Sequence, residues 1–204
     1  MGANALVGLE REPPALRVQA DGAIIRNATG QIVVQRIEPR ARWSDLQVAE
    51  TTRALLRRIA AEPRAKGGAV TFFSGADKAT ETRAAEVLAA ELHLALYRVD
   101  LSVVVSKYLG ETEKNLDQVF AAVKPSDAVL FFDDADALFG TRTEVKDSHD
   151  RYANQEVSYL LQRLEQFQGV AILATNRTTQ IDPAVLRRFR HVVDFATEDP
   201  GKSG

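Results

Sequence analysis

A short stretch of the chain combines residues that could bind phosphate. Residues 74–82 read SGADKATET and stand between an apolar run at 69–73 and a helical run at 83–93. A strand, a glycine-led turn and a helix place backbone N–H groups where they can surround a phosphate. The stretch has one glycine, however, and an acid stands where such a loop would have its lysine. These residues alone are consistent with three interpretations of the stretch: a nucleotide site, an altered nucleotide site, or a segment that is not a nucleotide site.

Polar side chains follow two other apolar runs. Asp133 and Asp134 come directly after the run at 128–132, and Asn176 follows the run at 170–175. Acids at the end of a buried strand can hold Mg²⁺ and polarise an attacking water, and an amide nearby can orient that water. Acids that stabilise a helix N-terminus explain the two carboxylates equally well, and for Asn176 alone a turn is the favoured explanation.

Three arginines lie close together in the segment IDPAVLRRFR. Arg187, Arg188 and Arg190 directly precede an apolar run near 191–195, so they cannot all be core residues. They suit a salt-bridged rim, or an arginine that reaches the phosphate of a neighbouring subunit.

The elements that must position these residues alternate between strand and helix. Apolar runs predict strands, and an apolar period of 3.6 residues predicts helices. The expected strands are 69–73, 95–100, 128–132, 170–175 and 191–195, and the expected helices are 49–61, 79–93, 111–124 and 153–167. This order predicts an α/β domain over residues 41–196, with a doubly wound parallel sheet whose ligands bind at the carboxyl ends of the strands.

The ends of the chain have a different character. Residues 1–14 are expected to be a loose arm, and 197–204 a flexible tail. Between the arm and the α/β domain, short apolar runs joined by turn residues predict a small β element over about 15–38. We therefore divide off residues 1–40 as an N-terminal arm and β-hairpin extension. The sequence does not decide whether this extension is a cap, a partner-binding strand pair or packing.

Composition excludes several classes of site. The chain has 204 residues, a net charge of −2 and no cysteine, so disulfides, thiolate metal sites and cysteine nucleophiles are excluded. His93, His149 and His191 lack metal-ligand spacing. The charge gives no field that favours nucleic acid or an acidic membrane. No signal peptide and no apolar window of about 18 residues is found, so a cytoplasmic location is expected.

Residues 43–195 resemble the AAA+ ATPase module of the P-loop NTPase superfamily. The matching segments, in order, are WSDLQVAETTRALLRRI at the entry helix, FFSGADKATET at Walker A, FFDDADALF at Walker B, ILATN at sensor 1 and IDPAVLRRFR at the arginine-finger segment. SKYLGETEKNLDQVF is similar to the segment with the first pore loop, where Tyr108, Leu109 and Gly110 would grip a threaded polypeptide. TEVKDSHDRYANQEVSYLLQRLEQFQG is similar to a bacterial subgroup that includes ATPases of contractile injection systems.

The resemblance implies a large AAA+ subdomain, a ring of subunits, and ATP with Mg²⁺ as cofactor. It also implies a role for each matching residue: Gly75, Lys78, Thr80, Glu81 and Thr82 in the phosphate loop, Thr82 and Asp133 on Mg²⁺, Asp134 and Asn176 in hydrolysis, and Arg188 and Arg190 in a neighbour's site.

Several positions depart from the family pattern G-x-x-x-x-G-K-[ST]. Thr80 replaces the second glycine and Glu81 replaces the lysine. Two unit charges about 4 Å apart at an effective dielectric constant near 20 interact by about 4 kcal/mol, so an ionised Glu81 would strongly repel phosphate. Asp134 replaces a glutamate, and a shift of about 1 Å there can cost on the order of 100-fold in rate. The family's helical lid, with its sensor 2 arginine, would follow residue 195 and is not expected within ATEDPGKSG, unless the sequence is a fragment of a longer chain.

These departures predict a degenerate AAA+ domain with little or no ATPase activity and no held nucleotide. It would be an interaction, assembly or regulatory subunit, in a ring of copies or with an intact paralogue, and could contact a polypeptide substrate but no nucleic acid or membrane. One alternative is a weakly active ATPase and unfoldase in which Lys78 binds phosphate. The other is a stand-alone adaptor whose N-terminal β element binds a partner.

Overall fold

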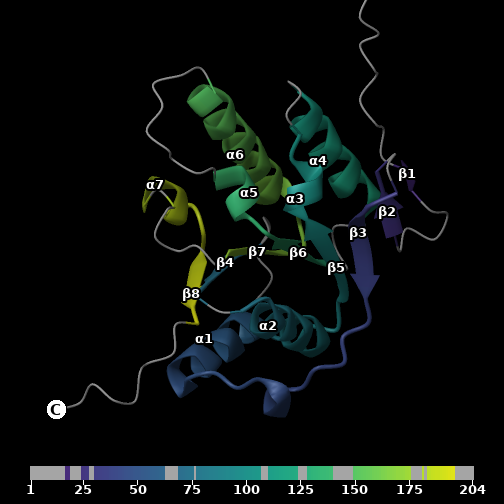
Figure 1. Ribbon diagram of the computed structural model, residues 1–204. Coiled ribbons are helices and arrows are strands. Elements are labelled where there is room, and N and C mark those ends of the chain that lie inside the picture. The colour runs from purple at the N-terminus through teal and green to yellow at the C-terminus, as the bar shows by residue number, and fades with distance from the viewer. Residues whose placement is uncertain are drawn as a thin grey trace, which may run out of the picture.

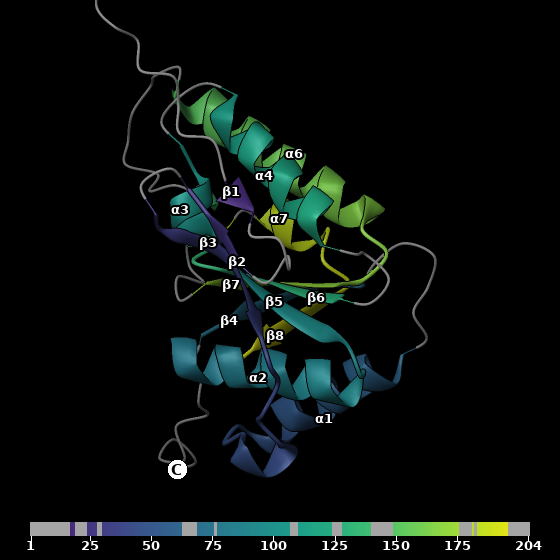
Figure 2. The same ribbon diagram turned by 90° about the vertical axis from the view of Figure 1, so that its right-hand side faces the viewer.

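One mixed β-sheet lies between two layers of helices (Figures 1 and 2). The computed structural model describes residues 17–18, 24–27, 30–62, 69–75, 77–106, 110–123, 128–139, 149–175, 181 and 183–195. The strands in spatial order are β1 (Arg17–Val18), β2 (Ile24–Arg26), β3 (Ile32–Ile37), β5 (Ala95–Asp100), β6 (Ala128–Asp133), β7 (Val170–Thr175), β4 (Ala69–Ser74) and β8 (His191–Asp194). The strands from β5 to β8 in this order are parallel, and β1, β2 and β3 are antiparallel additions.

Helices cover both faces of the parallel part. The helices α1 (Glu50–Ala61) and α2 (Lys78–Glu91) pack on one face, and α3 (Leu101–Val104), α4 (Glu111–Ala122), α5 (Asp136–Phe139), α6 (His149–Gln166) and α7 (Pro183–Leu186) lie on the other. A 3₁₀ turn, η1 (Trp43–Asp45), precedes α1. Every residue of β6 and β7 is buried, as expected for strands covered on both sides.

Two apolar clusters form the core, one on each face of the sheet. Leu56 and Leu88 pack against Phe131 on the α1 and α2 side. Leu116 and Leu160 pack with Phe132 on the α4 and α6 side. Because successive residues of a strand point to opposite faces, neighbouring phenylalanines of β6 serve both clusters.

The predicted doubly wound α/β fold with an N-terminal β extension is confirmed. The expected strands at 95–100 and 170–175 have the observed bounds, while the helix expected at 153–167 begins earlier, at His149. The one-turn elements η1, α3, α5 and α7 were not expected, because four residues or fewer show no helical period. Within the described residues, no helix is both long and apolar enough to cross a membrane.

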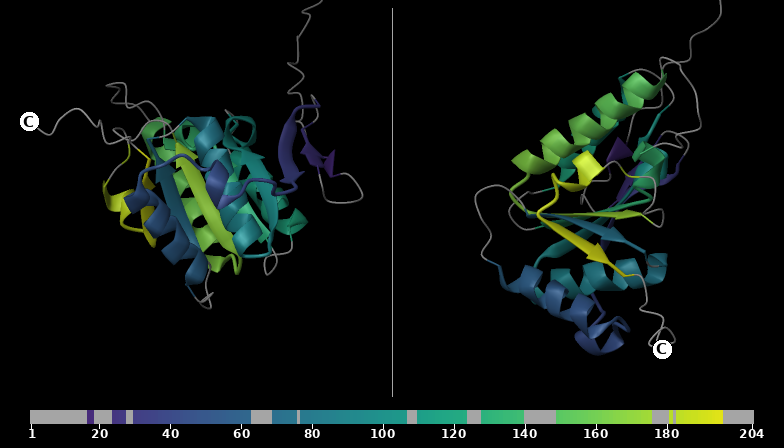
Figure 3. Two further views of the ribbon diagram at one scale, coloured as in Figure 1. Left: turned by 90° about the horizontal axis from the view of Figure 1, so that it is seen from below. Right: turned by 90° about the vertical axis from the view of Figure 1, so that its left-hand side faces the viewer.

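The N-terminal strands continue the main sheet. Strand β3 pairs antiparallel with β5, and Val34 lies opposite Val99 across this pair. Figure 3 shows β1, β2 and β3 at the edge of the sheet far from β8. Because Val34 is fully buried, this extension is part of the core of the α/β domain.

We predict that the N-terminal extension unfolds together with the α/β domain. Val34→Ala should lower the free energy of unfolding by about 2 kcal/mol, because it removes two buried methyl groups. The neighbouring Gln35→Ala, at an exposed position of the same strand, should change it by less than about 0.5 kcal/mol. Urea unfolding followed by circular dichroism measures both values, and equal small effects would contradict the prediction.

Candidate functional site

The candidate site lies where the parallel strands end and α2 begins. Gly75 follows β4 with a φ of +83°, a left-handed conformation that favours glycine. The helix α2 then begins at Lys78, three residues before the position of the expected lysine. Thr80, Glu81 and Thr82 are therefore in the first turns of a helix rather than in an open loop.

Asp77 explains why the helix begins so early. Its Oδ1 accepts hydrogen bonds from the backbone N–H groups of Ala79 (2.9 Å) and Thr80 (3.0 Å), so it caps the N-terminus of α2. The Thr80 hydroxyl donates to the other carboxylate oxygen at 3.0 Å. These hydrogen bonds, those from Thr80 first, hold the pKa of Asp77 below its usual value. The N–H groups that could bind a phosphate thus already bind a carboxylate of the chain itself.

Glu81 is buried and lies among other acids. Its residue is 1% exposed, and Oε1 has no hydrogen-bond partner within the described part of the chain. Burial raises the pKa of Glu81 to about 8, with further increases from Asp133, Asp77 and Asp134 and a smaller opposing effect of Lys78. The folded protein therefore holds Glu81 protonated at neutral pH. The repulsion of phosphate expected from its charge applies only above that pKa.

Lys78 points toward the end of β6. Its Nζ lies 2.6 Å from each carboxylate oxygen of Asp134, and this interaction raises the pKa of Lys78. Asp134 has a φ of +56°, in a left-handed conformation that aspartate tolerates better than most residues. The hydroxyl of Thr82, which the resemblance assigns to Mg²⁺, donates to the Lys78 carbonyl at 2.7 Å.

Asp133 is almost fully buried and has a cationic partner. Its side chain is 3% exposed, and its Oδ2 accepts hydrogen bonds from Nε (3.0 Å) and Nη2 of Arg98 on β5. Its Oδ1 accepts the backbone N–H of Asp134 at 2.8 Å. Sequence reasoning missed Arg98, although an arginine within the strand ALYRVD was a usable signal, since a charge in a buried strand needs a partner.

The remaining site predictions fall partly outside the described residues. Asn176, Tyr108 and Leu109 lie outside them, so their roles stay predictions. Gly110 is described and exposed, and it precedes α4 with a φ of +76°. Thr175, which ends β7, donates its hydroxyl to Asp136 at 3.3 Å.

Both expected trans arginines form ion pairs within the chain. The Arg188 guanidinium lies 2.5 Å from the carboxylate of Glu165, and Arg190 lies 3.0 Å from that of Glu62. These side chains are partly or largely exposed, and such pairs are worth about 1 kcal/mol or less. Either arginine could therefore exchange its partner for a ligand at little cost.

The residues present do not fit Mg·ATP in the manner that the resemblance implies. The N–H groups at the start of α2 bind Asp77, and both acids at the end of β6 bind cationic side chains. A cavity of about 400 Å³ opens beside Gly75, and its lining includes Asp77 and Thr80, which already bind each other. Among the described residues, no group of three or more His, Cys, Asp or Glu side chains is placed to hold a metal ion.

Comparison with known proteins identifies relatives of the chain. The family model described as "ATPase family associated with various cellular activities (AAA)" matches residues 72–197. An uncharacterized AAA family ATPase, y4kL, of Sinorhizobium fredii is 37% identical over 173 residues, which are 79% of this chain and 52% of that protein. A proteasome-activating nucleotidase of Methanococcus vannielii is 33% identical over 126 residues, 58% of this chain and 31% of that protein. Chicken spastin is 27% identical over 202 residues, 86% of this chain and 32% of that protein. The chain thus spans about half or less of the length of these relatives.

We predict that Glu81 makes the stability of the domain depend on pH. The folded state keeps the Glu81 proton up to a pH of about 8, while an unfolded glutamate releases it near its ordinary pKa of 4.5. The contribution of Glu81 to the free energy of unfolding is therefore fully present below pH 4.5 and is lost as the pH rises toward 8. The loss is on the order of a few kcal/mol.

Urea unfolding at several pH values between about 4.5 and 8.5 measures this dependence. Glu81→Gln should flatten the decline, because an amide does not titrate. Glu91→Gln, at the exposed end of the same helix, should retain the wild-type decline. Parallel pH profiles for the wild type and Glu81→Gln would show that Glu81 is not held protonated.

Proposed function

Because the chain belongs to the AAA family of ATPases, we propose that it is an AAA subunit that neither binds nor hydrolyses ATP and that acts through assembly with other AAA subunits. One observation carries this proposal: the chain's own acids, Asp77 on the helix N-terminus and Glu81 inside the helix, stand where phosphate and lysine would meet.

Hydrolysis of ATP depends on cations placed around the phosphates. Lys78 is the nearest candidate within the loop, and its pair with Asp134 is half exposed, so breaking that pair alone costs about 1 kcal/mol or less. The Asp77 cap, worth about 1 kcal/mol, would also have to open. Glu81, which burial keeps protonated at neutral pH, would supply no positive charge to the phosphate at the position of the lysine. These combined costs favour a subunit that holds no nucleotide over a weakly active ATPase.

The arginines near β8 support a role for the chain beside another subunit. The ion-pair partners of Arg188 and Arg190 in the described part of the chain, Glu165 and Glu62, are exposed or partly exposed, so a neighbour's phosphate can compete for these arginines. We propose that the neighbour is an AAA subunit with an intact G-x-x-x-x-G-K-[ST] loop, whose site this chain completes. We also propose that this ring acts on a polypeptide substrate, which passes through its central channel.

We expect the wild-type chain to show no binding of a fluorescent ATP analogue with Mg²⁺ up to about 1 mM, the upper end of common substrate affinities. Lys78→Ala should leave the titration unchanged. The combined change Asp77→Gly, Thr80→Gly and Glu81→Lys should tighten binding by at least about 100-fold, because it frees the helix N-terminus and supplies the lysine. Micromolar binding by the wild type that Lys78→Ala abolishes would instead identify a weakly active ATPase.

The trans role is tested with an intact AAA subunit from the same organism, co-purified with this chain. Assembly should raise that subunit's ATP turnover. Arg188→Ala should lower the turnover of the assembly by at least about ten-fold, since arginine fingers contribute about 10³ to 10⁵ in rate. Arg187→Ala, at the exposed neighbouring position, is the matched control and should preserve the gain. A stable assembly whose turnover is the same with and without Arg188 would assign the chain a scaffold role.

A further inference from the structure

Arg98 binds Asp133, the acid at the end of β6 to which the resemblance assigns Mg²⁺. We propose that Arg98 is a built-in counter-cation of Asp133 that excludes divalent cations from this end of the sheet. The inference rests on the proposed function, because it specifies which ligand the altered site cannot accept.

The hydrogen bonds of Asp133 leave little room for a metal. Two N–H groups of Arg98 donate to Oδ2, and the backbone N–H of Asp134 donates to Oδ1. Mg²⁺ requires oxygen ligands with free lone pairs at short distance, in near-octahedral geometry with several waters. The N–H groups of Arg98 occupy Oδ2, and at 3% exposure the lone pair that remains on Oδ1 has little room for a hydrated ion while Arg98 stays in place.

The strand register brings the arginine to this position. In the parallel pair of β5 and β6, Arg98 lies opposite Phe131, and Asp100 lies opposite Asp133. Residues two apart on a strand share a face, so the long Arg98 side chain can reach diagonally to Asp133. Asp100 does not compete for Arg98, because it accepts hydrogen bonds from the backbone and hydroxyl of Ser102 at the start of α3.

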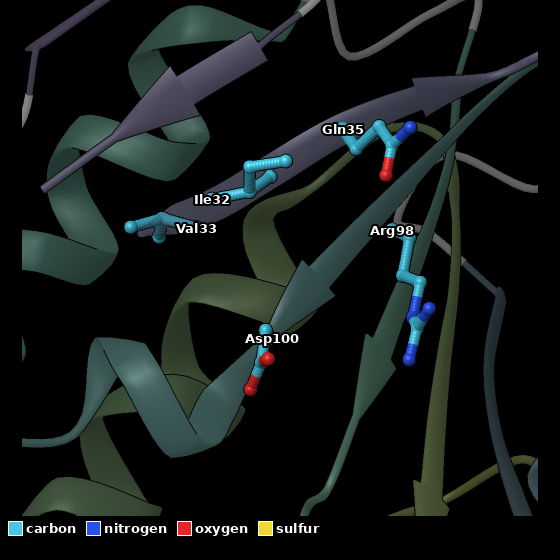
Figure 4. A pocket seen from close by; sticks show the side chains of 5 residues that line it. All are labelled: Ile32, Val33, Gln35, Arg98 and Asp100. Atoms are coloured by element: carbon cyan, nitrogen blue, oxygen red, sulfur yellow. The ribbon is translucent and has the colours of Figure 1, made fainter. Parts of the chain in front are cut away.

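The N-terminal extension lies beside β5, the strand that carries Arg98. Arg98 and Asp100 line a hollow of about 100 Å³ together with Ile32, Val33 and Gln35 of β3 (Figure 4). Because β3 pairs along β5, it covers the sheet edge beside Arg98. Strand β3 is therefore the neighbour of Arg98 on the side of β5 opposite to β6.

A second cation completes the charge balance. Lys78 binds Asp134, so each of the two acids at the end of β6 has a cationic partner from the chain itself. The Lys78 pair is more exposed than the Arg98 pair and holds its acid less firmly. Access to Asp133 therefore depends mainly on Arg98, and a lysine at position 81 alone would leave it closed to metal.

The test is a titration of the nucleotide-free chain with Mn²⁺, followed by electron paramagnetic resonance of the free ion. The wild type should show no site up to about 1 mM. Arg98→Gln should bind Mn²⁺ at least about ten-fold more tightly, because the freed and buried carboxylate then needs a new cation. Mn²⁺ should also raise the Tm of Arg98→Gln and not that of the wild type.

Two further variants serve as controls. Arg163→Gln removes an arginine of similar exposure, which pairs with Asp117 at 3.3 Å, and should bind no more Mn²⁺ than the wild type. In Arg98→Gln combined with Asp133→Asn, the gain should disappear, since the amide is a much weaker ligand.

Wild-type binding of Mn²⁺ that Asp133→Asn abolishes would overturn the inference, and so would a folded Arg98→Gln that binds no better than the wild type. If Arg98→Gln does not fold, Arg98→Lys replaces it, and its single ammonium should allow Mn²⁺ to bind more tightly than in the wild type. A folded Arg98→Lys with wild-type affinity then overturns the inference. Because no nucleotide is present, these results are independent of the ATP titration.

Discussion

The arrangement of the site depends on one constraint, the need to compensate the buried charge of Asp133. A parallel sheet covered by helices ends in a place that is partly closed to water, and Asp133 is fixed there because it is the last residue of β6. Leaving a buried charge without a partner costs about 3–5 kcal/mol, which is a large part of the stability of a typical domain. In this chain Arg98 of the neighbouring strand meets the requirement, so folding supplies the compensating charge without a ligand.

The other features of the site are weaker and follow from local chemistry. The Asp77 cap contributes about 1 kcal/mol, and the half-exposed pair of Lys78 with Asp134 about 1 kcal/mol or less. Glu81 avoids the cost of a buried charge by remaining protonated, since burial holds its pKa at about 8. The interactions are thus graded: the cap and the exposed pair could yield to a ligand, whereas the pair of Arg98 with Asp133 resists it.

The sequence predicted the features that depend on pattern and failed for those that depend on nonlocal contacts. Apolar runs and helical periods predicted the α/β sheet and placed Asp133, Gly75 and residues 77–82 at its carboxyl edge, where they lie. The early start of α2 was predictable in principle, because Asp77 is a favoured N-cap residue. Pairing of β3 with β5 was not, since nothing local specifies an antiparallel partner about 60 residues away. Nor could the sequence alone show that burial would keep Glu81 neutral.

The same difference between local and nonlocal information applies to family motifs. In its loop the chain differs from the family pattern at Thr80 and Glu81. From the loop alone, two substitutions would be expected to restore the nucleotide-binding sequence. In the structure the residues that set this site apart lie on α2, β5 and β6, and Arg98 is outside all of the matching segments quoted for the family. A cation from β5, held beside β3, satisfies an acid of β6, so the N-terminal extension and the altered site are physically linked through β5. The end of the sheet is therefore a packed part of the domain in which each acid at the end of β6 has a cationic partner from the chain itself.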